Sequence, residues 1–275
     1  MKHHRIIWLA ILLIAMMLVG CTPANSTPPA TDAPDATVSP TEPPTQEPTE
    51  PPTETPAETT APTDPEEDVV YEGDATSYYM DVVYPEQIDR YHTALAEKWN
   101  EDQYIENSMS EVLTAYYEGN PLNNVGFGFV DLDNDGRWEL VIGAIQDAET
   151  EPAVFEIWTL VDNKPVMVAQ ADAKNQYALQ YSEEDRAWYV AYESSHDVTS
   201  NGTYYLMLTE GKFEVMQGIV YHAEADNQNP WFMAYDLDWD ISNDEPIDED
   251  TANAIIETNR KLYTPLEFFP YILYK

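Results

Sequence analysis

The feature that most constrains the fold is a sharp change of composition near residue 68. Residues 22–68 consist mainly of proline, threonine, alanine and acidic residues, and they contain no aromatic and no basic side chain. Proline removes backbone donors and like charges repel, so this segment cannot bury a core and is predicted to be a disordered, extended linker. Fully extended, it would span on the order of 150 Å. A folded domain must therefore come from residues 69–275.

The first residues have the features of a secretion signal. Lys2 and Arg5 form a short basic start, and the apolar run "IIWLAILLIAMMLVG" follows. This run is short for a membrane span, which needs about 20 apolar residues, but it suits a signal peptide. It ends in "LVGC", which resembles the lipobox of bacterial lipoproteins. In that family the signal is cut before the cysteine, and the cysteine carries a diacylglyceryl group.

The resemblance therefore implies a signal peptide at residues 1–20 and lipid attachment at Cys21, at the start of the segment 21–68. Cys21 is the only cysteine, so the domain has no disulfide and its stability must come from its core or from a metal. The expected location is the cell membrane, with the chain facing the extracytoplasmic side. The alternative is an uncleaved anchor helix in which the cysteine is incidental.

The charge of the chain is strongly negative. It has 51 acidic residues against 12 Lys and Arg, a formal net charge of −39, and every acidic residue lies beyond Cys21. Such a field repels nucleic acid and anionic lipid headgroups and favours cations. The composition therefore excludes nucleic acid as a partner and indicates that the membrane is reached through the lipid on Cys21, not through a basic surface.

Residues 69–275 are long enough for a single globular domain with a sizeable core. Two stretches at its start have helical periodicity. In residues 85–101 apolar side chains recur at three- and four-residue intervals, and Pro85 suits a first helical position. Residues 104–121 show a second apolar face, and Gly119 near their end is a helix stop signal. The sequence predicts an N-terminal helical pair.

After this pair the pattern changes to short β-like runs joined by polar turns such as "DNK", "EEDR" and "EG". Short polar connections join antiparallel neighbours, because parallel strands need long crossovers. The candidate strands are residues 125–132, 138–145, 153–161, 165–171, 177–182, 187–193, 203–209 and 212–222. A last helix is expected near residues 247–262, with Asp248 as its cap. The predicted fold class is α+β: the helical pair packed on an antiparallel β-meander, with a C-terminal helix.

The stretch "VDLDNDGRWEL" has the spacing of a calcium loop. Counting from Asp131, acids stand at positions 1, 3, 5 and 9, with glycine at 6; the residues concerned are Asp131, Asp133, Asp135, Gly136, Arg137 and Glu139. Calcium takes six to eight oxygen ligands, and alternate carboxylates on a tight turn can converge on one ion, together with the backbone carbonyl at position 7. The sequence predicts that the four acids bind calcium with their side chains, while Arg137 contributes its carbonyl oxygen and directs its guanidinium away.

The loop departs from an EF-hand, which needs a bidentate glutamate at position 12 and flanking helices. Ile142 stands at that position, and both flanks have the pattern of strands. The loop instead resembles the calcium loops of FG-GAP and VCBS-type β-repeats, and it is similar to single loops in uncharacterised surface lipoproteins of Gram-positive, clostridial-type bacteria. The resemblance to the repeats implies a structural calcium site without catalysis. An acidic turn that binds no ion is the alternative.

A second acidic run, "DLDWDISNDEPIDED", covers residues 236–250. Asp236, Asp238 and Asp240 alternate as in the first loop, but Ile241 occupies the glycine position, where a β-branched residue resists positive φ. The sequence favours an acidic loop that leads into the last helix, and it leaves a second calcium site at residues 236–244 open.

No catalytic motif accompanies these loops: the chain has no HExxH, no GxSxG, no P-loop and no glycine-rich dinucleotide turn. Aromatic residues are abundant, and Trp231 and Trp239 lie among polar residues, either as core residues or as a platform for a glycan or a peptide. The sequence predicts a lipid-anchored cell-surface protein that acts as a binding module. A cell-wall glycan or another surface protein is the expected partner. The alternative is an extracytoplasmic hydrolase acting on polysaccharide or the cell wall.

Overall fold

A computed structural model describes residues 73–145, 153–223, 225 and 230–275. The predicted signal peptide, Cys21 and the whole predicted linker up to residue 68 lie outside the described residues. Within the described part of the chain, none of the helices combines the length and the apolar composition needed to cross a membrane.

Short helices open the described part of the chain. They are α2 (Ala75–Tyr78), a π-helix (Tyr79–Val83), α3 (Pro85–Glu97), α4 (Glu101–Glu106), a 3-10 helix (Glu111–Tyr116) and α5 (Pro121–Asn124). The helix predicted from residue 85 is α3, which has its proline in the first turn and buries Ile88, Tyr91 and Leu95. A capping box between Asn100 and Gln103 starts α4.

The second predicted helix, residues 104–121, is divided in the structure. Ser108 adopts a left-handed conformation (φ 52°) two residues after the end of α4, so the chain leaves the helix and re-forms as a 3-10 helix at Glu111. Ile105 is consequently 60% exposed, while Met109 and Leu113 are buried. The apolar spacing of this stretch therefore reflects two short elements that share one core.

The strands follow the helices. They are β1 (Val125–Val130), β2 (Glu139–Ala144), β3 (Val154–Val161), β4 (Lys164–Gln170), β5 (Asn175–Ser182), β6 (Ala187–Ser195), β7 (Ser200–Thr209), β8 (Lys212–His222), β9 (Trp231–Ala234), β10 (Glu245–Ile247) and β11 (Phe269–Pro270). The first eight overlap the eight predicted runs, with bounds that differ by up to three residues. The other three have two to four residues each, too few for a periodic signal.

All strand pairs are antiparallel, and the order along the sheet is β10-β9-β8-β7-β6-β5-β3-β2-β1-β11, with β4 paired to β3. The β3–β4 and β7–β8 hairpins have two-residue turns with positive φ at both residues, Asp162–Asn163 and Glu210–Gly211. Their twist matches that of the flanking strands. The predicted α+β class, with an antiparallel meander, agrees with this large sheet and its few helices.

The strand pairing is interrupted at β3. This strand pairs along its length with β4, and it pairs with β5 at only one position, Val154 with Tyr177. The β7–β8 turn packs against the end of β3: a Cβ placed on Gly211 would lie 2.4 Å from the Cγ2 atom of Val161. Only glycine permits this approach. The contact brings the β3–β4 and β7–β8 turns to the same end of the sheet as the β1–β2 loop. The candidate site lies at this end.

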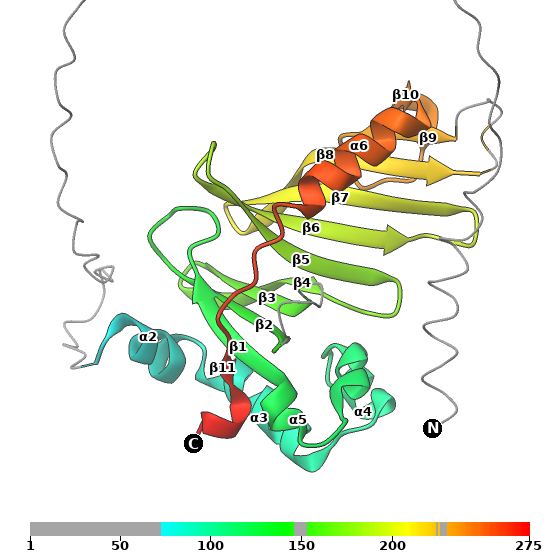
Figure 1. Cartoon of the computed structure of the whole chain (residues 1–275). Helices are drawn as coiled ribbons and strands as arrows, with labels where there is room; N and C mark the ends of the chain where they lie inside the picture. The colour runs from blue at the N-terminus through cyan, green and yellow to red at the C-terminus, as the bar shows by residue number, and fades with distance from the viewer. Residues whose placement is uncertain (1–72, 146–152, 224, 226–229) are drawn as a thin grey trace, which may run out of the picture. The chain divides into compact units, whose positions relative to one another are not determined.

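The core has two main clusters that share β2. Leu140 and Ile142 pack with α3 and the neighbouring helices, and Val141 faces a second cluster formed by strands β3 to β9. Because both faces are covered, every residue of β2 is buried. A smaller cluster joins β5, β6 and β7 to α6 (Glu249–Arg260), the orange helix in Figure 1. The Asp248 side chain accepts a hydrogen bond from Thr251 N at 2.7 Å, so the predicted cap is confirmed.

Candidate metal centre

The aspartate loop is the connection between β1 and β2. Val130 and Glu139 are the paired residues at the ends of the two strands, so the three aspartates of the loop stand between them and Glu139 begins β2. Leu132 is 2% exposed and packs in the second core cluster. This buried leucine anchors the loop, and the two flanking aspartates, Asp131 and Asp133, lie partly exposed on either side of it.

The bend of the loop is made by two left-handed residues, Asn134 (φ 57°) and Gly136 (φ 86°). Backbone N–H groups of the bend donate to the first aspartate: Asp135 N to Asp131 Oδ1 and Gly136 N to Asp131 Oδ2, both at 3.1 Å. Asp135 N also lies 3.2 Å from Asp133 Oδ1. The glycine prediction is confirmed here, because position 6 has the positive φ that favours glycine.

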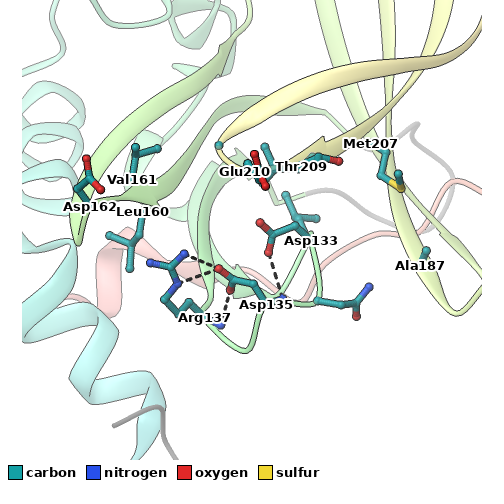
Figure 2. A pocket seen from close by; sticks show the side chains of 14 residues that line it. Asp133, Asp135, Arg137, Leu160, Val161, Asp162, Ala187, Met207, Thr209 and Glu210 are labelled. Atoms are coloured by element: carbon teal, nitrogen blue, oxygen red, sulfur yellow. Dashed lines mark hydrogen bonds and ion pairs between the residues drawn. The ribbon is translucent and has the colours of Figure 1, made fainter. Parts of the chain in front are cut away.

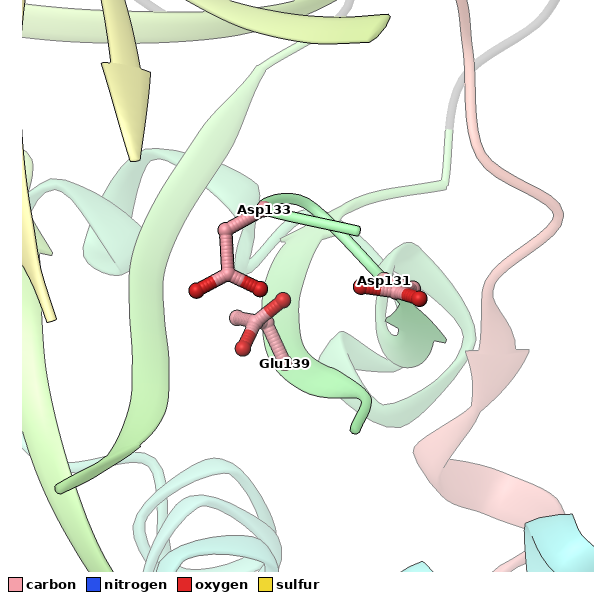
Figure 3. A group of neighbouring side chains, drawn as sticks. All are labelled: Asp131, Asp133 and Glu139. Atoms are coloured by element: carbon pink, nitrogen blue, oxygen red, sulfur yellow. The ribbon is translucent and has the colours of Figure 1, made fainter. Parts of the chain in front are cut away.

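Three acids of the loop converge. Asp131, Asp133 and Glu139 each offer one carboxylate oxygen, and these oxygens lie within 4.8 Å of one another. Figure 3 shows the carboxylates of Asp133 and Glu139 close together, with Asp131 beside them on the loop. Oxygens on opposite sides of an ion at 2.3–2.6 Å are separated by about 5 Å, so the group could hold a metal ion after little movement.

Glu139 forms the floor of this group. It is 1% exposed; Leu132 N donates to Oε2 at 2.7 Å and Thr159 Oγ1 donates to Oε1 at 2.9 Å. A carboxylate has about four lone-pair positions, so each oxygen can still bind an ion. Burial, which outweighs these hydrogen bonds, raises the pKa of Glu139 to about 8. Partial burial, with a contribution from neighbouring Asp135, also raises the pKa of Asp131 and Asp133.

Asp135 and Arg137 are arranged differently from the prediction. The Arg137 guanidinium does not point away from the loop: its Nε donates to Asp135 Oδ2 at 2.8 Å and its Nη2 forms an ion pair with the same oxygen. Asp135 Oδ1 accepts from Arg137 N. The Asp135 carboxylate is thereby held by Arg137 and lies outside the converging group. Arg137 thus neutralises one of the four loop acids.

The helical region supports the loop from the other side. Tyr84 Oη donates to the carbonyl oxygen of Trp138 at 3.0 Å, and the Tyr79 ring stacks on the Trp138 ring with centroids 5.2 Å apart. Both tyrosines are buried. They hold the residue that precedes Glu139, so the helices help to set where the floor of the site lies.

A cavity of about 450 Å³ opens beside the loop. It lies between the β1–β2 loop, the end of β3 with its turn, and the β7–β8 turn. Figure 2 shows Asp133, Asp162 and Glu210 reaching it from these three connections. Leucine, valine, alanine and methionine side chains line much of the rest, together with the polar Asn134, Asp135 and Thr209, and Arg137 is the one basic residue among the described lining residues. Asp133 belongs both to the converging acids and to the cavity lining, so an ion held there would have a side open to the cavity.

The two tryptophans considered as a platform lie elsewhere. Trp231, on β9, packs edge-on against Tyr221, and Trp239 packs on the second core cluster and stacks on His196 with centroids 5.1 Å apart. Both rings are half-buried. Neither lines the cavity, so the core interpretation of Trp239 is supported.

Several residues of the site carry no signal that sequence reasoning could use. Thr159 reaches Glu139 only because β3 pairs with β2, and Tyr84 reaches Trp138 across 54 residues of chain. Asp162 and Glu210 were recognisable as turn residues, but not as neighbours of one cavity. A comparison of the chain with protein-family models, with curated proteins and with solved structures found no match.

Proposed function

We propose that the β1–β2 loop is a structural calcium site. We also propose that the protein is a lipid-anchored surface protein whose folded domain, residues 69–275, acts by binding a partner. The observation that carries the first part is the convergence of Asp131, Asp133 and Glu139, with Glu139 at the buried floor. When these carboxylates are ionised they repel one another, by about 4 kcal/mol per pair of unit charges at 4 Å and an effective dielectric of 20. A bound cation removes this repulsion.

The donor set favours calcium among the common metal ions. All donors are oxygens, as calcium and magnesium prefer, and neither histidine nor cysteine belongs to the group. Magnesium keeps several waters and demands octahedral geometry at 2.0–2.1 Å, whereas calcium accepts more protein oxygens in flexible arrangements. The carbonyl of Arg137 and water would complete the shell. An affinity of about 10⁻⁴ to 10⁻³ M, the range of extracellular modules, is expected.

Calcium titration of the full chain, by calorimetry and by thermal melting, tests the site. Glu139→Gln should weaken binding at this loop at least about tenfold and remove the calcium-dependent rise of the melting temperature that comes from it. Glu183→Gln, the same substitution at an exposed position on another turn, is the matched control and should behave like the unmodified chain. Unaltered melting of the unmodified chain in 10 mM calcium would refute the proposal.

The surface location rests on "LVGC" and on the charge-rich, proline-rich segment that follows it. A cysteine lipidated after signal cleavage would anchor the chain, since each buried CH₂ of the acyl chains contributes about 0.8 kcal/mol. Labelling with a fatty acid analogue in a bacterial host should tag the unmodified chain and not Cys21→Ser. A labelled Cys21→Ser protein would contradict the lipoprotein assignment.

We further propose that the cavity beside the loop is where the folded domain binds its ligand, and that this ligand is rich in hydroxyl groups, as a cell-wall glycan is. Asp133, Asp162 and Glu210 can accept hydrogen bonds from hydroxyls, and a calcium ion at Asp133 can coordinate them. The apolar side chains offer a surface for the face of a sugar ring.

Binding to purified cell-wall glycan, in calcium and in a chelator, tests this role. Ala187→Trp places a large ring in the cavity without touching the loop acids, and it should abolish glycan binding while calcium binding persists. Val166→Trp, on the exposed part of β4 and outside the cavity lining, is the control. Equal binding by Ala187→Trp and the unmodified chain would exclude the cavity.

A hydrolase is the second candidate, because acids from three separate connections line one cavity. Glycoside hydrolysis needs two carboxyl groups on opposite sides of the scissile bond. If this reading holds, Glu210→Gln will abolish the release of reducing sugar from a polysaccharide while leaving calcium binding intact. Absence of release by the unmodified chain on all wall polysaccharides tested would favour the binding role.

A further inference from the structure

The second acidic run forms the connection between β9 and β10. β9 ends at Ala234, a 3-10 helix covers Ile241–Asn243, and β10 begins at Glu245. Counted from the first aspartate, acids again stand at positions 1, 3, 5 and 9, namely Asp236, Asp238, Asp240 and Asp244. These are the positions of the four acids in the β1–β2 loop.

Ile241, the residue that argued against an ion site, causes no conflict in the structure. No residue between 235 and 245 has a positive φ, and Ile241 begins the 3-10 helix. The turn is made instead by the Asp240 side chain, which accepts a hydrogen bond from Ser242 N at 3.1 Å. Glycine is favoured at a bend only where φ is positive, so isoleucine at position 6 does not exclude an ion here.

A buried phenol contacts this loop. Tyr204, on β7, is 1% exposed, and its hydroxyl has no hydrogen-bond partner among the described residues. Its ring meets the ring of Trp239, in the loop, edge-on at 6.2 Å. Gly202 leaves room for the hydroxyl, because a Cβ there would lie 3.0 Å from Tyr204 Oη. An unpaired buried hydroxyl destabilises the folded state, and a ligand in the loop would give it a hydrogen-bond partner.

Negative charges act on this hydroxyl. Burial is the main cause that raises the pKa of Tyr204, and the charges of Asp244, Asp236 and Asp238 add to it. Asp244 is partly buried, and with its neighbouring aspartates this raises its pKa to about 6. The ion pairs found in the described part of the chain involve Asp135 and Glu193, not the acids of this loop. Among the described residues, this loop thus presents four acidic side chains with no ion pair to a lysine or arginine.

We propose that the β9–β10 loop is a second divalent-cation site, in which Asp236, Asp238 and Asp244 bind a hard cation such as calcium above the hydroxyl of Tyr204. Tyr204 is a positioning residue: its hydroxyl donates a hydrogen bond to a ligand carboxylate or to a water on the ion. The loop acids are more exposed than those of the β1–β2 loop and must move closer to bind, so this site is the weaker of the two.

Calcium titration of the full chain carrying Asp133→Asn and Glu139→Gln isolates the second site. One saturable binding event should remain, and adding Asp238→Asn should weaken it at least about tenfold. Asp250→Asn removes the same charge from the nearby first turn of α6 and is the matched control, with little change expected. No saturable binding in the double variant, or equal losses from Asp238→Asn and Asp250→Asn, would overturn the proposal.

Terbium, a luminescent substitute for calcium, gives a second readout. Its emission on tryptophan excitation requires a nearby ring, and Trp239 stands within this loop as Trp138 stands within the first. In the double variant the emission should disappear with Trp239→Phe and persist with Trp138→Phe. The opposite result would place the ion at the first loop and overturn the assignment.

Tyr204→Phe tests the phenol with a readout that a purely structural role would not move. The variant keeps the ring and removes a hydroxyl that has no partner, so the cation-free protein should melt at the same temperature or higher. Cation affinity at the second loop should fall about tenfold. An unchanged affinity would overturn the role of Tyr204. Titration of Asp238→Asn alone reports the first loop, so failure at one loop is distinguishable from failure at the other.

Discussion

The two acidic loops share their spacing and differ in what lies beneath them. "DLDNDGRWE", from Asp131, and "DLDWDISND", from Asp236, both have acids at positions 1, 3, 5 and 9 and leucine at position 2. The first leucine, Leu132, is 2% exposed, whereas Leu237 is 44% exposed. The ninth residue of the first loop is Glu139, fully buried at the start of β2, while Asp244 stays partly exposed.

This difference shows that acids with the same spacing in the sequence need not have carboxylates that converge in the structure. In the described part of the chain, only the first loop brings three acidic oxygens within 4.8 Å of one another. Its buried leucine and buried glutamate fix both ends of the loop against the sheet, so the carboxylates between them have few alternatives. The second loop lacks a buried leucine and a buried ninth residue; it packs on the core through the half-buried Trp239 and Ile241. Its aspartates accept hydrogen bonds from backbone N–H groups one after another along the chain. Equal spacing therefore yields a preformed site only where the core holds the loop.

The largest expected effect concerns the anchors. Leu132→Ala should lower the free energy of unfolding by about 2–5 kcal/mol, because it leaves a cavity in the core. Leu237→Ala, at the same position of the second loop, should change it by less than about 0.5 kcal/mol. Urea denaturation measures both. Similar losses in the two variants would show that burial does not distinguish the loops.

The pH dependence of stability should also separate them. Glu139 has an ordinary pKa of 4.5 and a folded pKa of about 8, so between these values the cation-free folded state holds a proton that the unfolded state has lost. Stability should therefore fall as the pH rises from 5 to 8, by on the order of 2 kcal/mol or about 4–8 °C in melting temperature. At the proposed calcium site, saturating calcium should take the place of the proton and abolish this fall.

Glu139→Gln is the control for this effect, because its side chain does not titrate. Melting curves in a chelator at pH 5 and pH 8 should show a smaller fall for the variant than for the unmodified chain. Asp244, with a pKa raised to about 6, contributes in the same direction over a narrower window. If Glu139→Gln retained the full pH dependence of stability, Glu139 would not be its origin.

Substituting two glycines tests whether the bend of the first loop is needed for calcium binding. Gly136 and Gly119 both have positive φ, and a Cβ at either would meet nothing within 4 Å. Alanine at each should cost about 1–2 kcal/mol of stability from backbone strain alone. Only Gly136→Ala should also weaken calcium binding, which titration measures. Equal calcium affinity in the two variants would remove the bend from the site.

The smallest expected effect is a gain in calcium affinity. Arg137→Gln releases the Asp135 carboxylate from its ion pair, so a fourth acid can turn toward the ion and a positive charge is lost. Calcium affinity should rise about two- to fivefold, which corresponds to about 0.5–1 kcal/mol for an exposed charge pair. Lys174→Gln, an exposed charge change away from the loop, should leave it unaltered. Weaker binding by Arg137→Gln would mean that the ion pair organises the loop.

Much of the fold was predictable because its signals are local. Alternating side chains and polar turns located β1 to β8, and the helix signals located α3 and α6 with its cap. Three short strands were missed, since two to four residues carry no periodicity. The pairing of β11 with β1 joins the chain's end to its first strand, and no local pattern encodes it.

The candidate site was predictable as a set of residues but not as an arrangement. Spacing identified the five residues from Asp131 to Glu139, yet the structure groups three of their carboxylates and pairs Asp135 with Arg137. For the second loop, spacing suggested a site and Ile241 argued against it. The backbone conformation removes that objection, and a tyrosine from another strand supplies the supporting contact.

By itself, the sequence determined where a core can form, which segments alternate as strands, and which acids share a loop, because each of these depends on neighbours along the chain. Only the tertiary structure decided which acids converge and what they face. That outcome depends on strand pairing that sets Thr159 beside Glu139, and on burial that fixes one loop against the core while leaving the other open to solvent.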